Sequence, residues 1–222
     1  DDTVNGGEDT IEGNQGGDTI YGGAGNDSIS GGDASSNLIY GGNGDDLIKS
    51  FGFNSSASDD NSKDTLYGGS GNDTLHGGHA SDEIYGDAAN DSISGNSGAD
   101  SIIGGLGDDY LAGNNGPDII WGDNKDIDNN SSDGNDTIYG GNQKDTIYGG
   151  GGEDSIDGGN HKDVIRGESG NDYLHGRGHN DTIYGGEGAD TIHGGNHSDL
   201  LYGGSGNDRL FASGGNGNDT LY

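Results

Sequence analysis

Aspartate side chains recur at a nearly constant spacing, so carboxylate oxygens are the chemistry that the chain offers in quantity. Triplets of the form Asp-x-Ile or Asp-x-Leu run from Asp9 to Asp219, mostly nine residues apart, and make 22 units. The aliphatic residue is present in every unit, and Asn37 is the one replacement of Asp. An all-oxygen ligand set selects hard cations, and flexible turns rich in carbonyl groups suit Ca²⁺ better than octahedral Mg²⁺. The pattern therefore predicts multiple calcium ligands.

The residues around each Asp predict a tight turn followed by a short strand. Each unit reads Gly-Gly-x-Gly-x-Asp-x-Ile/Leu-x, as in Gly68 to His76. Glycine supplies backbone conformations with positive φ, whereas Thr, Ile, Leu and Tyr favour strands. Because side chains alternate across a strand, the Ile/Leu column is expected to face inward and its two neighbours outward. The density of glycine and the lack of a 3.6-residue period exclude helices.

The composition excludes several classes of protein. The 222 residues include 52 Gly, 25% hydrophobic residues and a net charge of −32 at pH 7. Low hydrophobicity with high net charge is typical of disordered chains, but the regular nine-residue period contradicts disorder. The negative charge repels phosphate groups, so nucleic acid is not expected as a partner. No apolar run reaches the ~18 residues of a transmembrane segment, and the absence of Cys excludes disulfides and thiolate metal sites.

The nonapeptide resembles the RTX (repeats-in-toxin) calcium-binding repeat over essentially the whole chain. Clean matches are Gly22 to Asp27, Gly68 to Asp73 and Gly203 to Asp208. In that family two nonapeptides form one coil of a parallel β-roll, and calcium lies between successive turns, held by Asp carboxylates and turn carbonyls. The resemblance implies an all-β fold, a right-handed parallel β-roll (β-solenoid) of about 11 coils with about 18 residues per coil.

Residues 1–222 are expected to form a single solenoid with two insertions. The spacing between successive units doubles from Asp46 to Asp64 and from Asp118 to Asp136. If each long gap is one turn with nine added residues, surface loops are expected at about 50–61 and 123–133. The turns then alternate between two edges of the coil, and each edge keeps its own composition.

The two edges are defined by the Asp that ends each turn. Edge A comprises the turns that end at Asp9, Asp27, Asp46, Asp73, Asp91, Asp109, Asp136, Asp154, Asp172, Asp190 and Asp208. Edge B comprises those that end at Asp18, Asn37, Asp64, Asp82, Asp100, Asp118, Asp145, Asp163, Asp181, Asp199 and Asp219. Edge A keeps the Gly two residues before Asp in every turn except that of Ala89, whereas edge B often replaces it with Ser, Ala, Gln or His.

The different turns predict different calcium occupancy. Residues other than Gly resist a positive φ, and Lys63, Lys144 and Lys162 place an ammonium directly before an edge B Asp. We therefore expect about ten calcium ions on edge A and fewer on edge B. The expected ligands on edge A are Asp27, Asp46, Asp73, Asp91, Asp109, Asp136, Asp154, Asp172, Asp190 and Asp208. On edge B they are Asp18, Asp100 and Asp118, where the glycine is retained.

The residue after Ile/Leu also differs between the two strands of a coil. Strands that leave edge B carry an aromatic column, and strands that leave edge A a polar one. The predicted aromatic face comprises Tyr21, Tyr40, Tyr67, Tyr85, Trp121, Tyr148, Tyr184 and Tyr202. Two interpretations stay open: stacking that stiffens the sheet, or an interface for glycan, ice, a second copy or another chain.

Three histidines recur every eighteen residues, at His161, His179 and His197. A straight column converges poorly on one zinc ion, so a turn-filling role is favoured over a zinc site. Ser and His are plentiful, but no nucleophile motif or metalloprotease helix accompanies them, so an enzyme is not expected.

Two functions fit this sequence. The first is a calcium-binding structural or secretion module of an exported bacterial protein, which folds on meeting extracellular calcium; the RTX resemblance implies type I secretion and a secreted or cell-surface location. The second is an adhesive or self-assembling surface protein that uses the aromatic face.

Overall fold

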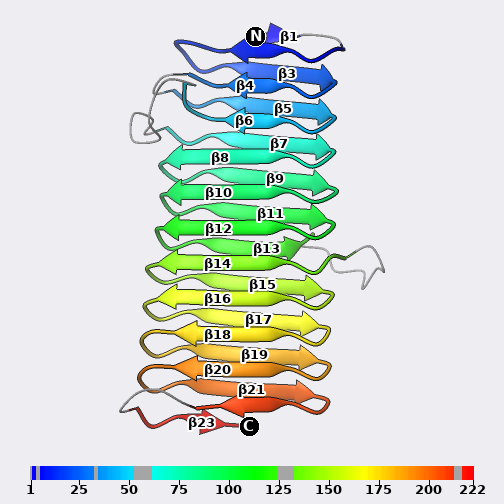
Figure 1. Ribbon diagram of the computed structural model, residues 1–222. Coiled ribbons are helices and arrows are strands. Elements are labelled where there is room, and N and C mark those ends of the chain that lie inside the picture. The colour runs from blue at the N-terminus through cyan, green and yellow to red at the C-terminus, as the bar shows by residue number, and fades with distance from the viewer. Residues whose placement is uncertain (1, 4–5, 33–34, 53–61, 125–132, 213–216) are drawn as a thin grey trace.

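The computed structural model describes residues 2–3, 6–32, 35–52, 62–124, 133–212 and 217–222. Within these ranges every regular element is a β-strand, and paired strands run parallel. The strands stack into a rod with the two chain ends at opposite ends (Figure 1). The all-β solenoid expected from the repeat is confirmed. No helix long and apolar enough to cross a membrane occurs in the described ranges.

Two parallel sheets form the long walls of the rod, and the chain alternates between them as it winds. The twelve-stranded sheet contains β1 (Asp2–Thr3), β3 (Thr19–Ala24), β5 (Leu38–Asn43), β7 (Thr65–Ser70), β9 (Glu83–Ala88), β11 (Ser101–Leu106), β13 (Ile119–Asp123), β15 (Thr146–Gly151), β17 (Val164–Ser169), β19 (Thr182–Glu187), β21 (Leu200–Ser205) and β23 (Thr220–Leu221). The eleven-stranded sheet contains β2 (Thr10–Glu12), β4 (Ser28–Ser30), β6 (Leu47–Lys49), β8 (Thr74–His79), β10 (Ser92–Ser97), β12 (Tyr110–Asn115), β14 (Thr137–Asn142), β16 (Ser155–Asn160), β18 (Tyr173–Arg177), β20 (Thr191–Gly195) and β22 (Arg209–Phe211).

Edge A and edge B are the two narrow sides of the rod. Turns of edge A lead from the twelve-stranded to the eleven-stranded sheet and lie at the right in Figure 1, and turns of edge B lead back. Paired positions are mostly 18 residues apart. The separation rises to 27 between Asp46 and Asp73 and between Asp109 and Asp136. Each long gap therefore adds nine residues without changing the alternation of the sheets, as expected.

Most of the two expected loops, residues 53–61 and 125–132, lies outside the described residues. The start of the second loop differs from the expectation. Asp123 is the last residue of β13 and is only 5% exposed.

The Ile/Leu column fills the space between the sheets. From Ile11 to Leu201 these side chains are at most 5% exposed and form one continuous cluster. Fully burying one such side chain contributes about 1.5–3 kcal/mol. The core ends at the last coils, where Leu210 is only partly buried and Leu221 is 45% exposed. The expected inward direction of this column is confirmed for the buried members.

Positive φ angles recur at the second and fourth residues of the turn. The second and fourth residues of the turn that ends at Asp27 are Gly23 and Gly25, with φ of 110° and 118°. On edge B the fourth residue adopts a positive φ even without Gly, as at Ala80, Gln143, His161, His179 and His197. The turn geometry of edge B is thus preserved despite the side chains that replace Gly.

The first glycine of the unit is required by packing rather than by φ. A Cβ on Gly86 would collide with Oδ2 of Asp91 and with the carbonyl oxygen of Gly104 in the next coil. At Gly178, by contrast, the nearest atoms to an added Cβ are 3.7 Å and 3.8 Å away.

Replacing Gly86 by Ala should therefore destabilise the calcium-bound rod by about 1–3 kcal/mol, because the methyl group overpacks a closed site. The matched control Gly178→Ala should change the free energy of unfolding by less than about 0.5 kcal/mol. Denaturant unfolding at saturating calcium measures both. Equal effects of the two substitutions would contradict the packing role of the first glycine.

Candidate metal centre

The Asp that ends each turn points into the rod. Side chains alternate along a strand, so this Asp faces the same side as the Ile or Leu two residues later. Asp73, Asp136 and Asp190, for example, are 1% exposed. We call the Asp residues that end the turns of one edge an Asp column. The columns thus lie along the inner face of the two edges rather than on the outer surface of the turns.

One oxygen of each buried carboxylate joins neighbouring coils. The backbone N–H of each Asp donates to Oδ1 of the Asp one coil further along the same edge. On edge A these N···O distances are 2.7–3.1 Å, from the Asp9–Asp27 pair to the Asp190–Asp208 pair. On edge B they are 2.8–2.9 Å from the Asp64–Asp82 pair onward. Each column is therefore a continuous ladder of carboxylates bonded to the backbone.

The second oxygen, Oδ2, is buried without a hydrogen-bond donor. Among the described residues this holds for Asp9, Asp27, Asp46, Asp73, Asp91, Asp109, Asp136, Asp154, Asp172 and Asp190 on edge A and for Asp100, Asp118, Asp145, Asp163, Asp181 and Asp199 on edge B. Its neighbour is a carbonyl oxygen of the next coil. Asp27 Oδ2 and the Gly41 carbonyl oxygen lie 2.5 Å and 2.6 Å from the point that a Cβ on Gly22 would occupy. Both buried oxygens thus border the same small space beside Gly22, and a proton or a cation is needed to make this arrangement favourable.

Asn37, the one residue other than Asp in the edge B column, carries a hydrogen-bond donor at the position that Oδ2 occupies in the other turns. Its Oδ1 accepts from the N–H of Asp18 at 3.0 Å, as an Asp would. Its Nδ2 donates to the carbonyl oxygen of Ser50 in the next coil at 3.4 Å. The amide group therefore supplies the hydrogen atom that Oδ2 of an ionised Asp lacks.

Burial raises the pKa of many column carboxyls far above the ordinary value of 3.8. The pKa of Asp154 rises to about 9, and those of Asp109, Asp118 and Asp181 to about 8. Loss of solvation is the largest cause in each case, and repulsion between neighbouring Asp residues adds to it, whereas the bond from the backbone N–H opposes it. Without a cation these carboxyls hold protons at neutral pH.

The arrangement fits a hard cation bound by carboxylate and carbonyl oxygens. Oδ2 of the column and the carbonyl oxygens of the first glycines supply oxygen ligands, which Ca²⁺ prefers. The described residues contain no cluster of three or more Asp, Glu or His side chains arranged to hold one metal ion. Backbone carbonyls must therefore contribute much of any ligand set in these turns.

The structure gives the two edges the same inward carboxylate. The expected edge A ligands from Asp27 to Asp190 and the edge B residues Asp100 and Asp118 are all buried. Asp18 and Asp208 are half-buried near the ends of the rod. Sequence reasoning left out Asp145, Asp163, Asp181 and Asp199, which share this environment; their place in the nine-residue column was the signal for including them.

The lysines of edge B leave the pKa values of nearby column carboxyls raised. The Lys63 ammonium pairs with Glu83 at 2.7 Å. Burial raises the pKa values of Asp145 and Asp163 to about 7 although Lys144 and Lys162 directly precede them. Lys162 lowers the pKa of Asp181 but does not outweigh burial, which raises it to about 8. That these ammonium groups replace the charge of calcium stays a prediction.

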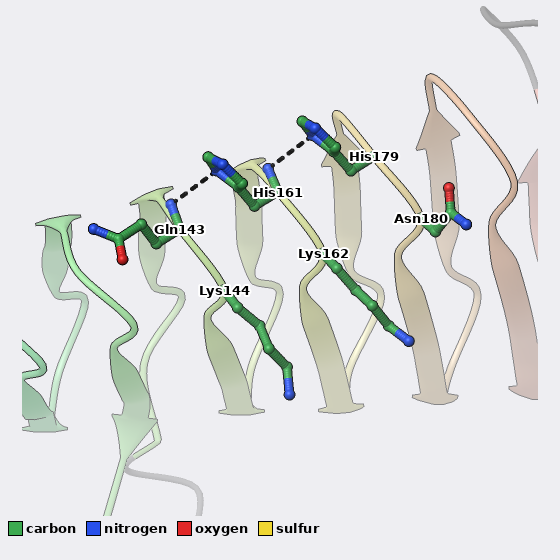
Figure 2. Close-up of a pocket in the computed structure, with 6 residues that line it drawn as sticks. All are labelled: Gln143, Lys144, His161, Lys162, His179 and Asn180. Carbon is green, nitrogen blue, oxygen red and sulfur yellow. Dashed lines mark hydrogen bonds between the residues drawn. The ribbon is translucent and has the colours of Figure 1, made fainter.

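The histidines of edge B are part of the turns. Figure 2 shows His161 and His179 stacked at the turn tips, with Lys144 and Lys162 pointing away from the imidazoles. The ring centroids of His161 and His179 are 4.9 Å apart, and those of His179 and His197 5.2 Å. Nδ1 of each ring accepts a backbone N–H from the previous coil at 3.2 Å, donated by Gln143, His161 and His179 in turn.

These hydrogen bonds engage the Nδ1 atoms within the turns. An imidazole nitrogen that accepts a backbone N–H has no lone pair left for a metal. The predicted turn-filling role is confirmed. Edge A uses a different side chain for the same purpose: Asn26, Asn72 and Asn90 each accept through Oδ1 a backbone N–H of the following coil at 3.0–3.1 Å.

The aromatic column on the twelve-stranded sheet is a stacked ladder, here called the tyrosine ladder. Successive rings from Tyr21 to Tyr85 have centroids 4.7–4.9 Å apart and are nearly parallel. Trp121 stacks on Tyr148 at 5.7 Å, and Tyr184 on Tyr202 at 4.7 Å. The guanidinium of Arg166 lies 4.4 Å from the Tyr184 ring centroid. The stacking interpretation is confirmed; a role in binding stays a prediction.

The opposite sheet is more aromatic than expected. Tyr110, Tyr139, Tyr173 and Phe211 are all at least 40% exposed there. The ring centroids of Tyr110 and Tyr139 are 5.5 Å apart, and the His193 ring stacks on the Phe211 ring with a centroid distance of 4.5 Å. The predicted polar face therefore also carries exposed aromatic rings: Tyr139 and Phe211 follow Ile or Leu, and Tyr110 and Tyr173 occupy the position between Asp and Leu.

A parallel β-solenoid with one inward carboxylate in nearly every nonapeptide turn defines a calcium-binding repeat protein. The family model described as RTX calcium-binding nonapeptide repeat (4 copies) matches residues 3–36, 32–50, 59–93, 85–120, 130–161, 157–192, 175–210 and 211–222. The chain belongs to this family. The family's fold is a structural calcium-binding fold, and its members are generally exported. No curated protein matches the chain.

Acid is expected to replace calcium in stabilising the rod. The folded chain holds Asp protons up to about pH 7–9, whereas the unfolded chain releases them near 3.8. Between these values the folded state binds more protons, so stability falls as pH rises. In EDTA the strand signal in far-UV circular dichroism should be present at about pH 4–5 and lost by about pH 8–9.

Asp154→Asn is the matched variant, because an amide at this place can donate to the next carbonyl as Asn37 does. It should keep its strand signal in EDTA to a higher pH than the unsubstituted chain. A strand signal in EDTA that grows with pH would contradict the buried carboxylate columns.

Proposed function

We propose that the chain is a calcium-folded structural and secretion module of an exported bacterial protein. The observation that carries this proposal is the set of buried Oδ2 atoms that face carbonyl oxygens. At neutral pH such oxygens favour unfolding unless a proton or cation neutralises them. Membership of the RTX family supports calcium as that cation.

Calcium-dependent folding would keep the chain unfolded inside the cell and fold it outside, where calcium is more abundant. Where free calcium is submicromolar, the ionised Asp columns oppose burial and the chain stays unfolded, which suits passage through a type I secretion channel. Outside the cell calcium reaches the millimolar range that extracellular modules bind. Binding and folding are then one event, since the site does not exist in the unfolded chain.

Edge A is proposed to hold more calcium than edge B. Both edges present inward carboxylates, but their turn tips differ. The fourth residue of edge A turns is almost always Gly, whereas His161, His179 and His197 carry side chains at this place and bond the tips together. We place about ten ions on edge A, and Asp18, Asp100 and Asp118 at the best sites of edge B.

A calcium titration followed by circular dichroism and a count of bound ions tests both parts. We expect an unfolded chain in EDTA at pH 8 and folding with about ten ions. Asp91→Asn on edge A should lower the number of bound ions, whereas the matched Asp181→Asn on edge B should not. A chain already folded in EDTA would refute the switch, and about twenty ions would refute the difference between the edges.

We also propose an association role for the tyrosine ladder, as part of an adhesive or self-assembling surface. The ladder extends along the rod from Tyr21, which is 43% exposed, to Tyr222, which is 70% exposed and stacks on Tyr202. Flat, regular aromatic faces suit sugar rings and a second copy of the same rod.

Replacing Tyr67, Tyr85, Tyr184 and Tyr202 by Ser should leave calcium-dependent folding intact and abolish association. Sedimentation velocity in calcium, with and without soluble glycans, measures this. Tyr110→Ser with Tyr139→Ser is the control, because it removes exposed rings from the opposite sheet. Association that survives the ladder substitutions would rule out the ladder as the interface.

A further inference from the structure

Asp123 is the one side chain outside the Asp columns that the described structure buries with a carboxylate oxygen lacking a partner. It is 5% exposed, and its Oδ1 has no hydrogen-bond donor. It ends β13, two residues after Trp121, and pairs in register with Gly105 of the preceding coil.

A structural role accounts for only one of its oxygens. The pairing of β13 with β15 ends at Trp121 and Tyr148. Beyond that point Asp123 Oδ2 accepts the backbone N–H of Gly151 at 2.7 Å, so the side chain replaces a missing backbone acceptor. Oδ1 remains buried beside this bond without a donor. Burying such an oxygen is costly unless a proton or a cation meets it.

The same place in the repeat does not by itself bury a carboxylate. Asp87 pairs with Gly105 from the other side and thus occupies the equivalent position on edge A two coils before Asp123. Its side chain is exposed. The position in the repeat therefore does not by itself account for the burial of Asp123.

A second carboxylate of the same turn lies close by. Asp133 Oδ2 lies 2.8 Å from the point that a Cβ on Gly151 would occupy, beside the Asp123 bond to that residue. Burial and then the negative charge of Asp133 raise the pKa of Asp123 to about 6. Negative charge is concentrated here, since Asp123 also raises the pKa values of Asp136 and Asp154.

The surface beside Asp123 is hollowed. A cavity of about 240 Å³ is lined by Trp121, Asp123, Asn124, Tyr148 and Glu168, with Gly149 and Gly150 contributing backbone. Gly150 pairs with Glu168, so a residue without a side chain lies between the carboxylates of Asp123 and Glu168. The cavity gives a small ion a path from solvent to the buried carboxylate.

We propose that Asp123 and Asp133 form a divalent-cation site outside the Asp columns, which opens to the cavity beside Trp121. Carboxylates and carbonyl oxygens are the ligands that Ca²⁺ takes, and water completes its shell. The net charge of −32 concentrates cations at the rod. This site is additional to the calcium of the repeats, and it exists only in the folded rod because the bond between Asp123 and Gly151 is a tertiary contact.

Terbium luminescence tests the site, because Tb³⁺ takes the oxygen ligands of Ca²⁺ and Trp121 is the single Trp of the chain. Excitation of Trp121 in the intact chain, folded by a titration with Tb³⁺, should give Tb³⁺ emission. Asp123→Asn should weaken the binding that this emission reports by at least about tenfold. The matched Asp87→Asn should not change it, and Trp121→Phe should remove the emission while calorimetry still detects the same number of bound ions.

Asp133→Asn is the second variant, since it keeps the bond between Asp123 and Gly151, and it should also weaken the binding that Tb³⁺ emission reports. Circular dichroism at saturating calcium checks that each variant folds. Unchanged emission in Asp123→Asn and Asp133→Asn would overturn the site. A chain already folded in EDTA would refute the calcium-folding proposal but would leave this site supported if the emission still depends on Asp123 and Asp133.

Discussion

A carboxylate oxygen buried against a carbonyl oxygen is the contact on which the rest of the rod depends. It follows from the period-two alternation that turns Asp and Ile/Leu to the same inner face. Oδ1 accepts a backbone N–H from the neighbouring coil, as between Asp73 and Asp91, so one oxygen of each Asp has a structural role. In the described part of the chain, Oδ2 of most column Asp residues has no donor within the protein and needs a proton or a cation from solution. The same side chain thus holds the coils together and makes their association conditional on a proton or a cation.

The two edges meet the backbone in different ways around this common column. On edge A, Asn side chains at the turn tips accept backbone N–H groups of the following coil, whereas on edge B His161, His179 and His197 accept those of the preceding coil. Both side chains supply one acceptor per coil. Asn does so with an amide oxygen, and His with a ring nitrogen of a stacked imidazole. Different residue types therefore build turns of similar backbone shape.

The sequence was sufficient to predict the solenoid, its two alternating edges and the buried Ile/Leu column, because a strict period leaves one consistent way to stack the chain. It predicted the calcium-type ligands but misjudged their setting. Asp was assigned to the turn, although its distance of two residues from Ile/Leu already puts it inside. The outward position after Ile/Leu does not predict the exposed rings of Tyr110 and Tyr173, because these residues precede Leu. Asp123 was assigned to a loop because an insertion follows it, and its hydrogen bond to Gly151 is a tertiary contact that no local pattern contains.

The register of the sheets has a consequence for how such a rod can change in length. The two long gaps join positions 27 residues apart, nine more than the usual 18, yet Tyr40 still stacks on Tyr67 and Ile120 still pairs with Ile147. If the nine residues had formed half a coil, every later strand would lie in the other sheet. The tyrosines beyond that point would then lie on the opposite face, and the His turns would stack on the Asn turns. Gain or loss of whole coils preserves every column, so parity, rather than length, is what duplication and deletion must conserve in this chain.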